Sequence, residues 1–255
     1  MIALDAALLA ASEAAAVVVE RSAPLRVRHK GTIDLVTEVD LECERVIRRI
    51  LEKATPNIPI YAEEGGGAST ALTRWVVDPL DGTTNYVHGF PSYGVSIALQ
   101  EDGQTTLGVI ADPVRQRLFS AQKGKGAFCD GERLRVSDCR DLIEALVGTG
   151  FPYDRHTEAD YYLRFVSAVM KRVQGVRRAG AACMDLAMLA AGQLDAFWEF
   201  HLAPWDVAAG VLLVEESGGR VTSHDGTPLD RVKPSPLATN QRLHEHMMDV
   251  LATVK

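Results

Sequence analysis

The sequence predicts a protein of mixed α and β structure, with an α+β first half and an α/β second half. Two helical patterns near the N-terminus precede a long series of strand-like runs, which indicates an antiparallel sheet. After about Asp138, strand-like and helical segments alternate, which is typical of an α/β unit. We therefore expect two units, residues 1–140 and residues 141–255, that meet near residue 140.

The first unit begins with two predicted helices. Residues 2–21 form an alanine-rich apolar segment, and a second helix is expected within residues 34–57. Apolar residues of the second segment recur at helical spacing, namely Leu41, Val46, Ile47, Ile50 and Leu51. Pro56 lies just past its end, where a helix commonly stops. Short strands are then expected over residues 58–66 and 73–78.

Residues 93–136 predict an antiparallel meander, because apolar runs there are separated by regular turn signals. These signals are the sequences EDGQ, ADPV, KGKG and CDGE. The second unit predicts strands over 142–152, 194–200 and 220–226 and helices over 161–173, 181–193, 205–219 and 240–254. Glycines follow two of these helices, Gly192 after one and Gly218 and Gly219 after another, as expected of helix ends.

Composition indicates a globular protein, with 255 residues, 47% hydrophobic and 24% charged. We see no run of about eighteen apolar residues, so no transmembrane helix is expected. The N-terminal segment has no basic region of the signal-peptide kind. The four cysteines are scattered, with no C-x-x-C pair, which favours reduced thiols and a cytoplasmic location.

The formal net charge of −7 disfavours nucleic acid as the main partner, because phosphate backbones require clustered Lys and Arg. One basic stretch, KRVQGVRR at residues 171–178, is the exception. An acidic protein can still bind a phosphate substrate if metal ions supply the positive charge.

The stretch WVVDPLDGTT, residues 75–84, predicts a functional site at the end of an apolar strand. Pro79 fixes the backbone between Asp78 and Asp81, and Gly82 permits a conformation that other residues resist. A helix or turn that starts here would offer free N–H groups to an anion. Two carboxylates beside such groups suit a hard cation that bridges to a phosphate, although an Asp-Gly pair also occurs in ordinary turns.

Further acids lie elsewhere along the chain. Glu63 and Glu64 follow a short strand and could add a metal ligand, although a solvated loop would have the same sequence. Asp206 is predicted as a helix N-cap that could also face a site. Thr37 and Asp40 have the spacing of a capping box, and Asp40 could instead orient a hydroxyl or a water.

Common catalytic motifs are missing from the sequence. It contains no G-x-S-x-G, no G-x-G-x-x-G and no P-loop motif. The neighbouring His244 and His246 would lie on different faces of a helix, so a histidine metal site is not expected. A carboxylate-only site remains, and that ligand set is expected for Mg²⁺.

Taken in order, these acidic motifs resemble the inositol monophosphatase family, within the lithium-sensitive, magnesium-dependent phosphatase superfamily. The superfamily pattern is Asp, then Glu-Glu, then Asp-Pro-[Ile/Leu]-Asp-Gly-[Thr/Ser], then Trp-Asp. Here it occurs as Asp40, Glu63-Glu64, DPLDGT at 78–83 and Trp205-Asp206, and the similarity runs from about Lys30 almost to the C-terminus. The resemblance implies a layered αβαβα sandwich of the fructose-1,6-bisphosphatase and inositol monophosphatase type.

The resemblance also implies roles for individual residues, with two to three Mg²⁺ ions per site as cofactor. The implied metal ligands are Glu63, Asp78, the main-chain carbonyl of Leu80, Asp81 and Asp206, most of them in the first unit. Thr83, hydrogen-bonded to Asp40, is expected to orient and deprotonate the attacking water, with Glu63 close by. Substrate contacts are implied for Asp81, Gly82, Thr83, Gly180, Ala181, Ala182 and Glu199, and Lys30 and Asp34 are implied as outer members.

The implied activity is hydrolysis of a phosphate monoester of a small polyol, most simply by a broadly specific inositol-1-monophosphatase that forms a homodimer and is inhibited by lithium. Fructose 1,6-bisphosphate, 3′-phosphoadenosine 5′-phosphate and histidinol phosphate are alternative substrates. Departures from the family pattern at Ala62, Gly65, Cys183 and Met184 remove no metal ligand but leave substrate choice open. A different alternative is a regulatory binding protein of the transcription machinery, which only the basic stretch at 171–178 supports.

Overall fold

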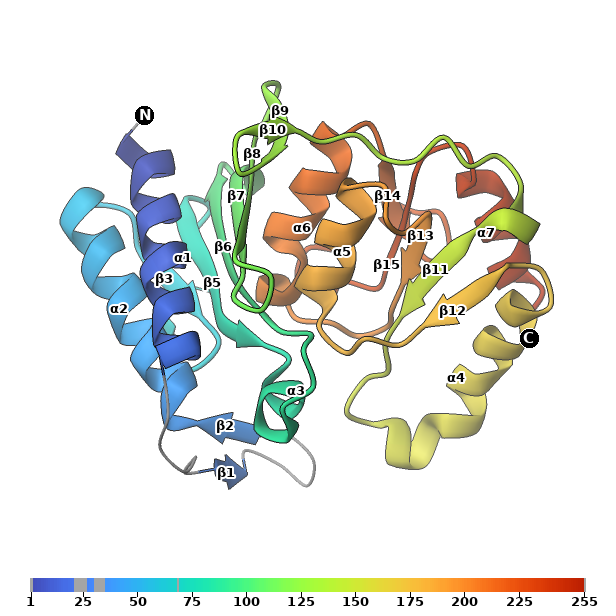
Figure 1. Ribbon diagram of the computed structural model, residues 1–255, viewed down its shortest axis with the longest axis horizontal. Coiled ribbons are helices and arrows are strands. Elements are labelled where there is room, and N and C mark those ends of the chain that lie inside the picture. The colour runs from blue at the N-terminus through green and yellow to red at the C-terminus, as the bar shows by residue number, and fades with distance from the viewer. Residues whose placement is uncertain (1, 21–26, 30–34, 68, 255) are drawn as a thin grey trace.

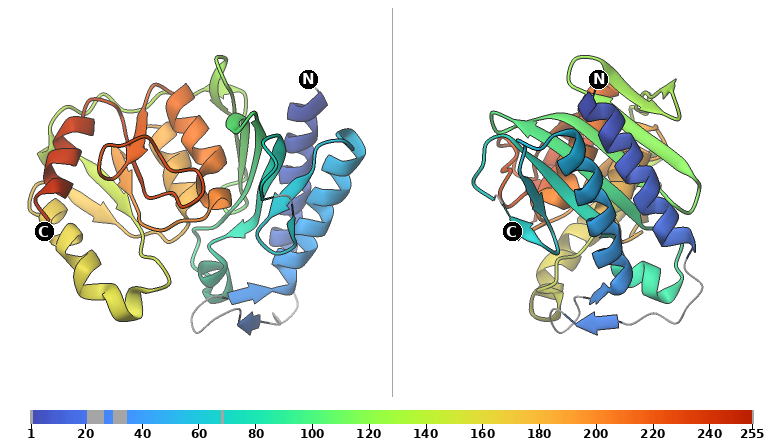
Figure 2. Two further views of the ribbon diagram at one scale, coloured as in Figure 1. Left: turned by 180° about the vertical axis from the view of Figure 1, so that it is seen from behind. Right: turned by 90° about the vertical axis from the view of Figure 1, so that its left-hand side faces the viewer.

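The computed structural model describes residues 2–20, 27–29, 35–67 and 69–254. They form five layers, in the order helices, sheet, helices, sheet, helices (Figure 1). The αβαβα sandwich that the resemblance implied is therefore confirmed. Figure 2 shows the same arrangement from behind, with the N-terminal and C-terminal helices on opposite outer layers.

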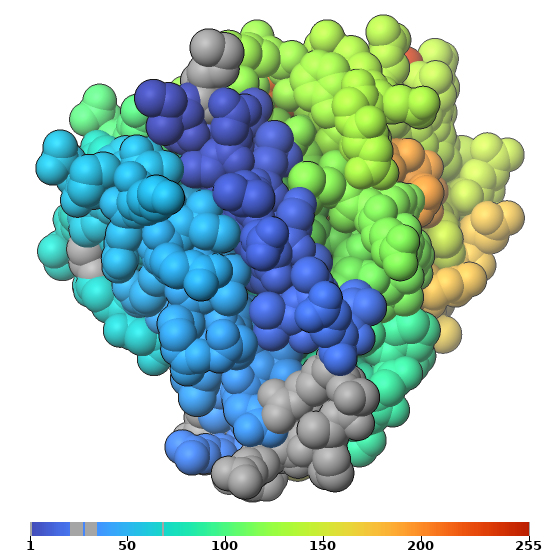
Figure 3. Space-filling view, turned by 60° about the vertical axis from the view of Figure 1, so that its left-hand side comes forward, coloured from blue at the N-terminus to red at the C-terminus, as the bar shows by residue number. Residues whose placement is uncertain are grey.

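The first outer layer consists of α1 (Ile2–Glu20) and α2 (Glu38–Ala54). By length and composition alone, α1 is the one helix of the described residues apolar enough to cross a membrane, contrary to the expectation from the sequence. Its buried alanines, among them Ala7, Ala10 and Ala14, instead pack against α2 and the first sheet. Figure 3 shows α1 lying beside α2 on this face of the molecule. The helix is therefore part of the core of the fold.

The first sheet has eight strands in the order β10-β9-β8-β7-β6-β5-β3-β4. Its strands are β3 (Ile60–Ala62), β4 (Gly66–Gly67), β5 (Arg74–Asp81), β6 (Gly94–Glu101), β7 (Gln104–Asp112), β8 (Arg117–Gln122), β9 (Gly126–Cys129) and β10 (Glu132–Arg133). From β5 to β10 every neighbouring pair is antiparallel, which confirms the predicted meander. At two of its turns, Asp102-Gly103 and Asp130-Gly131 have positive φ angles, as hairpin turns require.

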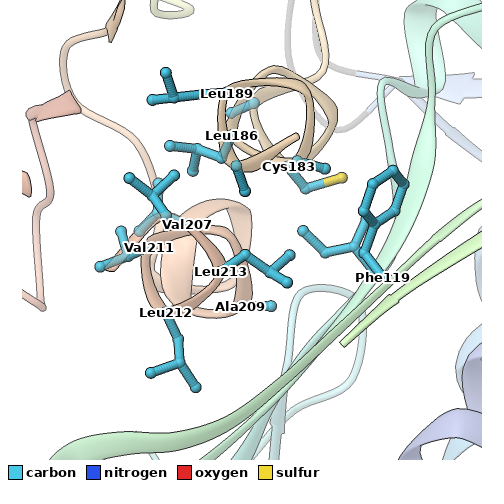
Figure 4. Packing of buried hydrophobic residues seen from close by; sticks show 14 of the residues in the cluster. Phe119, Cys183, Leu186, Leu189, Val207, Ala209, Val211, Leu212 and Leu213 are labelled. Atoms are coloured by element: carbon cyan, nitrogen blue, oxygen red, sulfur yellow. The ribbon is translucent and has the colours of Figure 1, made fainter. Parts of the chain in front are cut away.

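The middle layer consists of α5 (Ala182–Ala190) and α6 (Pro204–Glu216), which are apolar on nearly every face. A helix that is apolar all round is buried on all sides, and here the two sheets cover the pair. Leu186 of α5 lies next to Val207 of α6, while Phe119 of β8 lies beside Cys183 (Figure 4). Both helices are therefore fixed by packing against the sheets and against each other.

The second sheet is mixed and has five strands in the order β12-β11-β13-β15-β14. They are β11 (Leu146–Thr149), β12 (Gly175–Arg177), β13 (Ala196–Trp198), β14 (Arg220–Ser223) and β15 (Pro236–Thr239). β11 runs parallel to both β12 and β13, and β15 runs antiparallel to β13 and β14. The last outer layer is α4 (Arg155–Met170) with α7 (His244–Ala252), which pack on this sheet through a third apolar cluster.

Four short elements complete the described chain. β1 (Val27–His29) and β2 (Leu35–Thr37) form an antiparallel pair at the foot of α2. The third is α3 (Thr83–His88), which follows Gly82 at the end of β5, so of the helix or turn expected there the helix is observed. A single 3₁₀ turn, Leu142–Glu144, precedes β11.

Several expected boundaries are wrong, and local hydrogen bonds explain two of them. The second helix begins at Glu38 because the Thr37 side chain accepts from Val39 N while Asp40 accepts from Thr37 N, so Leu35–Thr37 stay extended. This is the capping box that the spacing predicted. Helix α6 begins at Pro204, so Asp206 is not its N-cap but the third helical residue, where it accepts from Ala203 N.

The helix expected over residues 161–173 also has different bounds. Helix α4 stops at Met170, and Gly175–Arg177 form β12 at the edge of the second sheet. Strand β15 was missed altogether, and α7 begins at His244. The proposed boundary between two units near residue 140 stays a prediction. Helices α5 and α6, which belong to the second unit, pack against the sheet of the first unit.

Replacing Gly108 with alanine should destabilise the fold. Gly108 lies on β7, and an added Cβ would stand 2.9 Å from both the Cα and the carbonyl oxygen of Ala209 in α6. These are backbone atoms that the middle layer holds in place, so overpacking should cost about 1–3 kcal/mol. Urea unfolding would measure the loss. Gln104→Ala at the exposed start of the same strand is the control and should change stability by less than about 0.5 kcal/mol; equal effects would contradict this account.

Candidate active site

A cavity of about 340 Å³ opens where β5 ends and where α3, α5 and α6 begin. It brings together most of the residues proposed from the sequence, namely Glu63, Asp78, Leu80, Asp81, Gly82, Thr83, Gly180, Ala182, Glu199 and Asp206. A larger hollow of about 580 Å³ lies between α4 and the end of α7, but Asp160 is its only acid. The smaller cavity is therefore the candidate active site on chemical grounds.

The end of β5 is distorted in a way that exposes its acids to this cavity. Asp78 pairs with Ser96 of β6 and Asp81 pairs with Gly94, so β5 carries one more residue than its partner between these pairs. Pro79 has no N–H to donate to the ladder, which makes such a bulge favourable. The Leu80 N–H turns back to Asp78 Oδ1, at 3.0 Å, and holds that carboxyl in place.

Gly82 then redirects the chain into α3. Its φ of 89° lies in the left-handed region, and a Cβ there would meet the Ser92 carbonyl oxygen at 2.9 Å, so a glycine is required. Helix α5 also contributes to the site, because Cys183 N at its start donates to Asp81 Oδ2 at 2.7 Å. The carboxylate of Asp81 is therefore held by a main-chain N–H from the second half of the chain.

Asp206 enters from the first turn of α6. Its Oδ2 accepts from Ala203 N at 2.7 Å, which ties the acid to the start of its own helix. The Trp205 ring packs edge-on against Tyr61 of β3, with ring centroids 5.2 Å apart. Ser96 Oγ on β6 donates to the Trp205 carbonyl at 3.1 Å, so the first sheet fixes the position of this helix start.

Thr83 and Asp40 form the hydrogen bond that the resemblance implied. Thr83 Oγ1 lies 2.9 Å from Asp40 Oδ1 and 3.0 Å from the Leu80 carbonyl oxygen. Asp40 is 1% exposed and lies behind Thr83, outside the cavity lining. Its other oxygen accepts from Thr37 N and Thr37 Oγ1, so the capping box of α2 also orients the Thr83 hydroxyl.

The turn that carries Glu63 depends on a buried acid that the sequence analysis did not single out. Glu44 of α2 is 5% exposed, and its Oε2 accepts from both Glu64 N and Gly65 N. Arg48 Nε, 2.7 Å from Glu44 Oε1, balances its charge. The Glu63 side chain is thus presented by a turn that is anchored to α2, whereas Glu64 does not line the cavity.

The acids of the cavity resist ionisation in the absence of a cation. Burial, and then the charges of Glu63, Asp81 and Asp206, hold the pKa of Asp78 well above its usual range. Burial likewise raises the pKa of Asp81 to about 6, against the opposing hydrogen bond from Cys183 N. Burial and the charge of Asp81 raise the pKa of Asp206 well above its usual range. A positive charge among these groups would favour their ionised forms.

This donor set fits a hard divalent cation. All its side-chain donors are carboxylate oxygens, which Mg²⁺ prefers. As the side chains lie, no three acidic, cysteine or histidine groups of the described residues already form a metal-binding cluster. Asp81 and Asp206 each accept a hydrogen bond from a main-chain N–H through one carboxylate oxygen. The fit rests on the donors and their mutual repulsion, and the individual ligand assignments stay predictions.

Glu199 lines the cavity and depends on Gly150, which follows the end of β11. A Cβ on Gly150 would stand 2.1 Å from the Glu199 carboxyl. Burial, and next the charge of Asp185, raise the pKa of Glu199 well above its usual range. Asp185 was not proposed from the sequence, although it is a charged residue inside an apolar helix.

One further predicted residue, Ala181, is not part of the cavity lining. Ala181 is 1% exposed and packs beneath Gly82 instead of lining the cavity. Lys30 and Asp34, the implied outer members, lie outside the described residues. Among the cavity residues that sequence reasoning did not propose, three carry basic side chains, namely Arg155, Arg178 and His201. No local pattern marks them, because they approach the acids only through the tertiary fold.

The fold and the acid-lined cavity define a phosphoric monoester hydrolase. The model of the inositol monophosphatase family matches residues 2–255, so the chain belongs to this metal-dependent family. The chain is 46% identical to "Nus factor SuhB" of Pseudomonas aeruginosa, over 88% of this chain and 86% of that protein. It is 45% identical to "Inositol-1-monophosphatase" of Caulobacter vibrioides, over 89% of this chain and 91% of that protein.

Solved structures agree with the family. The extragenic suppressor protein suhB from Bartonella henselae has a TM-score of 0.92 and 38% identity, with 97% of each chain covered. An IMPase/NADP phosphatase complexed with Mg²⁺ and phosphate has a TM-score of 0.78 and 26% identity, with 89% of this chain and 85% of that chain covered.

Replacing Asp81 with asparagine should stabilise the metal-free protein at neutral pH. The pKa of Asp81 is about 6, whereas that of aspartate in an unfolded chain is about 3.9. The protonated Asp81 therefore contributes to the free energy of unfolding below about pH 4, and this contribution is lost as the pH rises through about 6, because Asp81 ionises less readily in the folded state than in the unfolded chain. Asp81→Asn removes this loss, so urea unfolding with a chelator present should show a gain on the order of 1 kcal/mol at pH 7 and little change at pH 4.

The control for this measurement is Asp249→Asn on the exposed face of α7, which should give no pH-dependent gain. Added Mg²⁺ should stabilise the wild-type protein more than Asp81→Asn. A variant that is less stable than the wild type at pH 7 without metal would contradict the account of the acids.

Proposed function

We propose that the cavity hydrolyses the phosphate monoester of a small polyol, with inositol 1-phosphate as the simplest substrate and broad specificity. One observation carries this proposal: Glu63, Asp78, Asp81 and Asp206 line one cavity beside a Thr83 hydroxyl that is hydrogen-bonded to Asp40. Uncatalysed monoester hydrolysis is extremely slow, so the site must lower a large barrier. Fixed acids that hold cations suit this chemistry.

Glu63, Asp78, the Leu80 carbonyl, Asp81 and Asp206 would hold two to three Mg²⁺ ions. When bound, Mg²⁺ would neutralise phosphate charge, lower the pKa of a coordinated water and stabilise the leaving alkoxide. The acids themselves need not react. Their part is to keep their positions, which the hydrogen bonds from Leu80 N, Cys183 N and Ala203 N support.

Thr83 and Asp40 would orient the attacking water. Thr83 Oγ1 donates its proton to Asp40 Oδ1 and keeps a lone pair that can accept a hydrogen bond from water. Asp40 is held by Thr37 at its other oxygen, so this acceptor cannot turn away. Glu63 lines the same cavity and can take up the proton that the water releases.

The phosphate would lie at the start of α3. The first N–H groups of a helix have no partner within the helix, and those of Gly82 and Thr83 stand at this end of the cavity. The alcohol would then extend toward Gly180, Ala182 and Glu199, where the Glu199 carboxyl can meet a hydroxyl. Such a contact favours polyols over simple alcohols.

A second role, as a partner of the transcription machinery, is favoured by the name "Nus factor SuhB" that some relatives carry. The exposed basic residues Lys171, Arg172 and Arg177 could contribute to such a role. Co-purification of transcription proteins with the chain, lost when these three residues are changed to Gln, would support it. A homodimer, the lack of membrane and nucleic-acid partners and a cytoplasmic location remain expectations from the sequence.

Replacing Asp206 with asparagine should reduce hydrolysis of inositol 1-phosphate by two or more orders of magnitude, because one carboxylate oxygen of the metal site is lost. The amide oxygen can still accept from Ala203 N, so the fold should persist. Phosphate release at saturating Mg²⁺ measures the effect, with Asp249→Asn as the control. Full activity of Asp206→Asn would overturn the metal assignment.

The substrate itself is tested by the rate at which the wild-type protein hydrolyses inositol 1-phosphate, fructose 1,6-bisphosphate, 3′-phosphoadenosine 5′-phosphate and histidinol phosphate.

Replacing Gly150 with alanine should weaken substrate binding through Glu199. The new Cβ would displace the Glu199 carboxyl, which lies 2.1 Å from its position. We expect KM for inositol 1-phosphate to rise about tenfold with a smaller change in kcat, as for a lost ground-state contact. Glu199→Asp shortens the side chain and makes room for the new Cβ. The double variant Gly150→Ala, Glu199→Asp should therefore have a lower KM for inositol 1-phosphate than Gly150→Ala alone. A double variant no better than Gly150→Ala would contradict this coupling.

A further inference from the structure

Helix α2 carries two buried acids, and the proposed chemistry uses only one of them. Asp40 and Glu44 are 1% and 5% exposed, and because they are four residues apart they lie on the same face of the helix. Asp40 accepts from the Thr83 hydroxyl. Glu44 accepts from Glu64 N at 3.1 Å and from Gly65 N at 3.0 Å. A buried carboxylate is costly without such partners, so both contacts are strongly favoured.

Glu63 lies where a strand and this helix together hold the main chain. Its N–H donates to the Val77 carbonyl at 3.1 Å, and Ala62 pairs with Val77 in the parallel register of β3 and β5. Glu63 therefore follows β3 beside the part of β5 that carries Asp78. Immediately after Glu63, the next two N–H groups of the chain both donate to Glu44. The course of the chain through Glu63 is thus set by β5 on one side and by Glu44 on the other.

Gly65 and Arg48 make the contact with Glu44 specific. A Cβ on Gly65 would stand 2.3 Å from Glu44 Oε1 and 2.7 Å from Arg48 Nη2, so the turn can come this close only with a glycine. Arg48 Nε donates to Glu44 Oε1 at 2.7 Å, and Arg48 Nη2 donates to the Gly66 carbonyl at 3.3 Å. The pair of Glu44 and Arg48 therefore holds three consecutive residues, from Glu64 to Gly66.

We propose that Glu44 is a positioning residue of the phosphatase reaction, because the turn that it holds sets where the Glu63 carboxyl stands relative to the Thr83 hydroxyl. This inference rests on the proposed function and deepens it. Asp40 and Glu44 are about 6 Å apart along one helix. Helix α2 would therefore hold the group that orients the water and the group that takes its proton at a fixed separation. Small displacements of such groups are costly for the rate.

Three substitutions of Glu44 test this proposal, because they separate the reach of the side chain from its charge. Glu44→Ala loses the contact, and Glu44→Asp keeps the charge but is too short to reach the turn. Glu44→Gln keeps the length and one oxygen that can accept from the turn. At saturating Mg²⁺, kcat for inositol 1-phosphate should fall about 10- to 100-fold in Glu44→Ala and Glu44→Asp, with KM within about twofold of the wild-type value. Glu44→Gln should retain most of the wild-type kcat.

Magnesium binding gives a readout that does not depend on turnover. Because Glu63 is one of the proposed ligands, the affinity for Mg²⁺, measured by calorimetry without substrate, should fall about tenfold in Glu44→Ala and stay near the wild-type value in Glu44→Gln. The matched control is Glu52→Ala, which removes an exposed acid from the same helix and should change neither kcat nor the affinity for Mg²⁺.

Gly65→Ala disturbs the same contact from the side of the turn and leaves α2 intact, so it serves as the test where Glu44→Ala does not fold. Its new Cβ would displace Glu44 and Arg48, and kcat should fall as in Glu44→Ala. Wild-type kcat in Gly65→Ala, or equal losses in Glu44→Gln and Glu44→Ala, would overturn this inference and leave the proposed function intact. If the wild-type protein hydrolyses neither inositol 1-phosphate nor any of the three alternative substrates with Mg²⁺, the proposed function fails and this inference fails with it.

Discussion

The burial of two helices between two sheets is the constraint on which the rest of the structure depends. Helices α5 and α6 have no face left for solvent, so their positions are set by packing on both sides. Small residues permit the close approach: Gly108 admits Ala209, and Gly210 admits Leu186. Because both helices begin at the end of β5, the packing that stabilises the fold also brings Asp206 and Cys183 N to the same place as Asp81.

The acids at this place oppose the stability that the packing provides. Buried carboxylates that raise one another's pKa are unfavourable in the ionised form unless a cation joins them. Functional sites commonly depart from the arrangement that would stabilise the fold most. Here the departure is confined to a few residues that main-chain N–H groups hold in position, so a large apolar core can offset its cost.

The sequence predicted what depends on local pattern and on the order of motifs. The αβαβα layers, the meander and the gathering of Glu63, Asp78 and Asp206 followed from residue spacing and from the resemblance. Strand β15 was not predicted, because Pro236–Thr239 is a short segment without an alternating pattern of apolar and polar residues. It forms a strand because it pairs with β13 and β14 in the sheet. Strand β12 was hidden within a run of charges, since an edge strand exposes them to solvent.

The site residues that escaped have a similar physical explanation. Glu44 and Asp185 lie inside helices, where nothing in the local sequence shows which turn or glycine they will meet. Arg178 is distant in sequence from Asp81, although its charge lowers the pKa of both Asp81 and Glu199. Conversely, Asp206 was assigned a cap because it precedes an apolar run, while Pro204 moves the start of the helix forward.

The double use of Asp40 joins a helix end to the chemistry of the site. One carboxylate oxygen holds the first turn of α2 through Thr37, and the other holds the Thr83 hydroxyl. Any fraying of that turn would release both contacts at once, since helix termini are where local opening begins. The rate of hydrogen exchange at the Thr37 amide is therefore a measure of how much of the time the Thr83 hydroxyl is held ready.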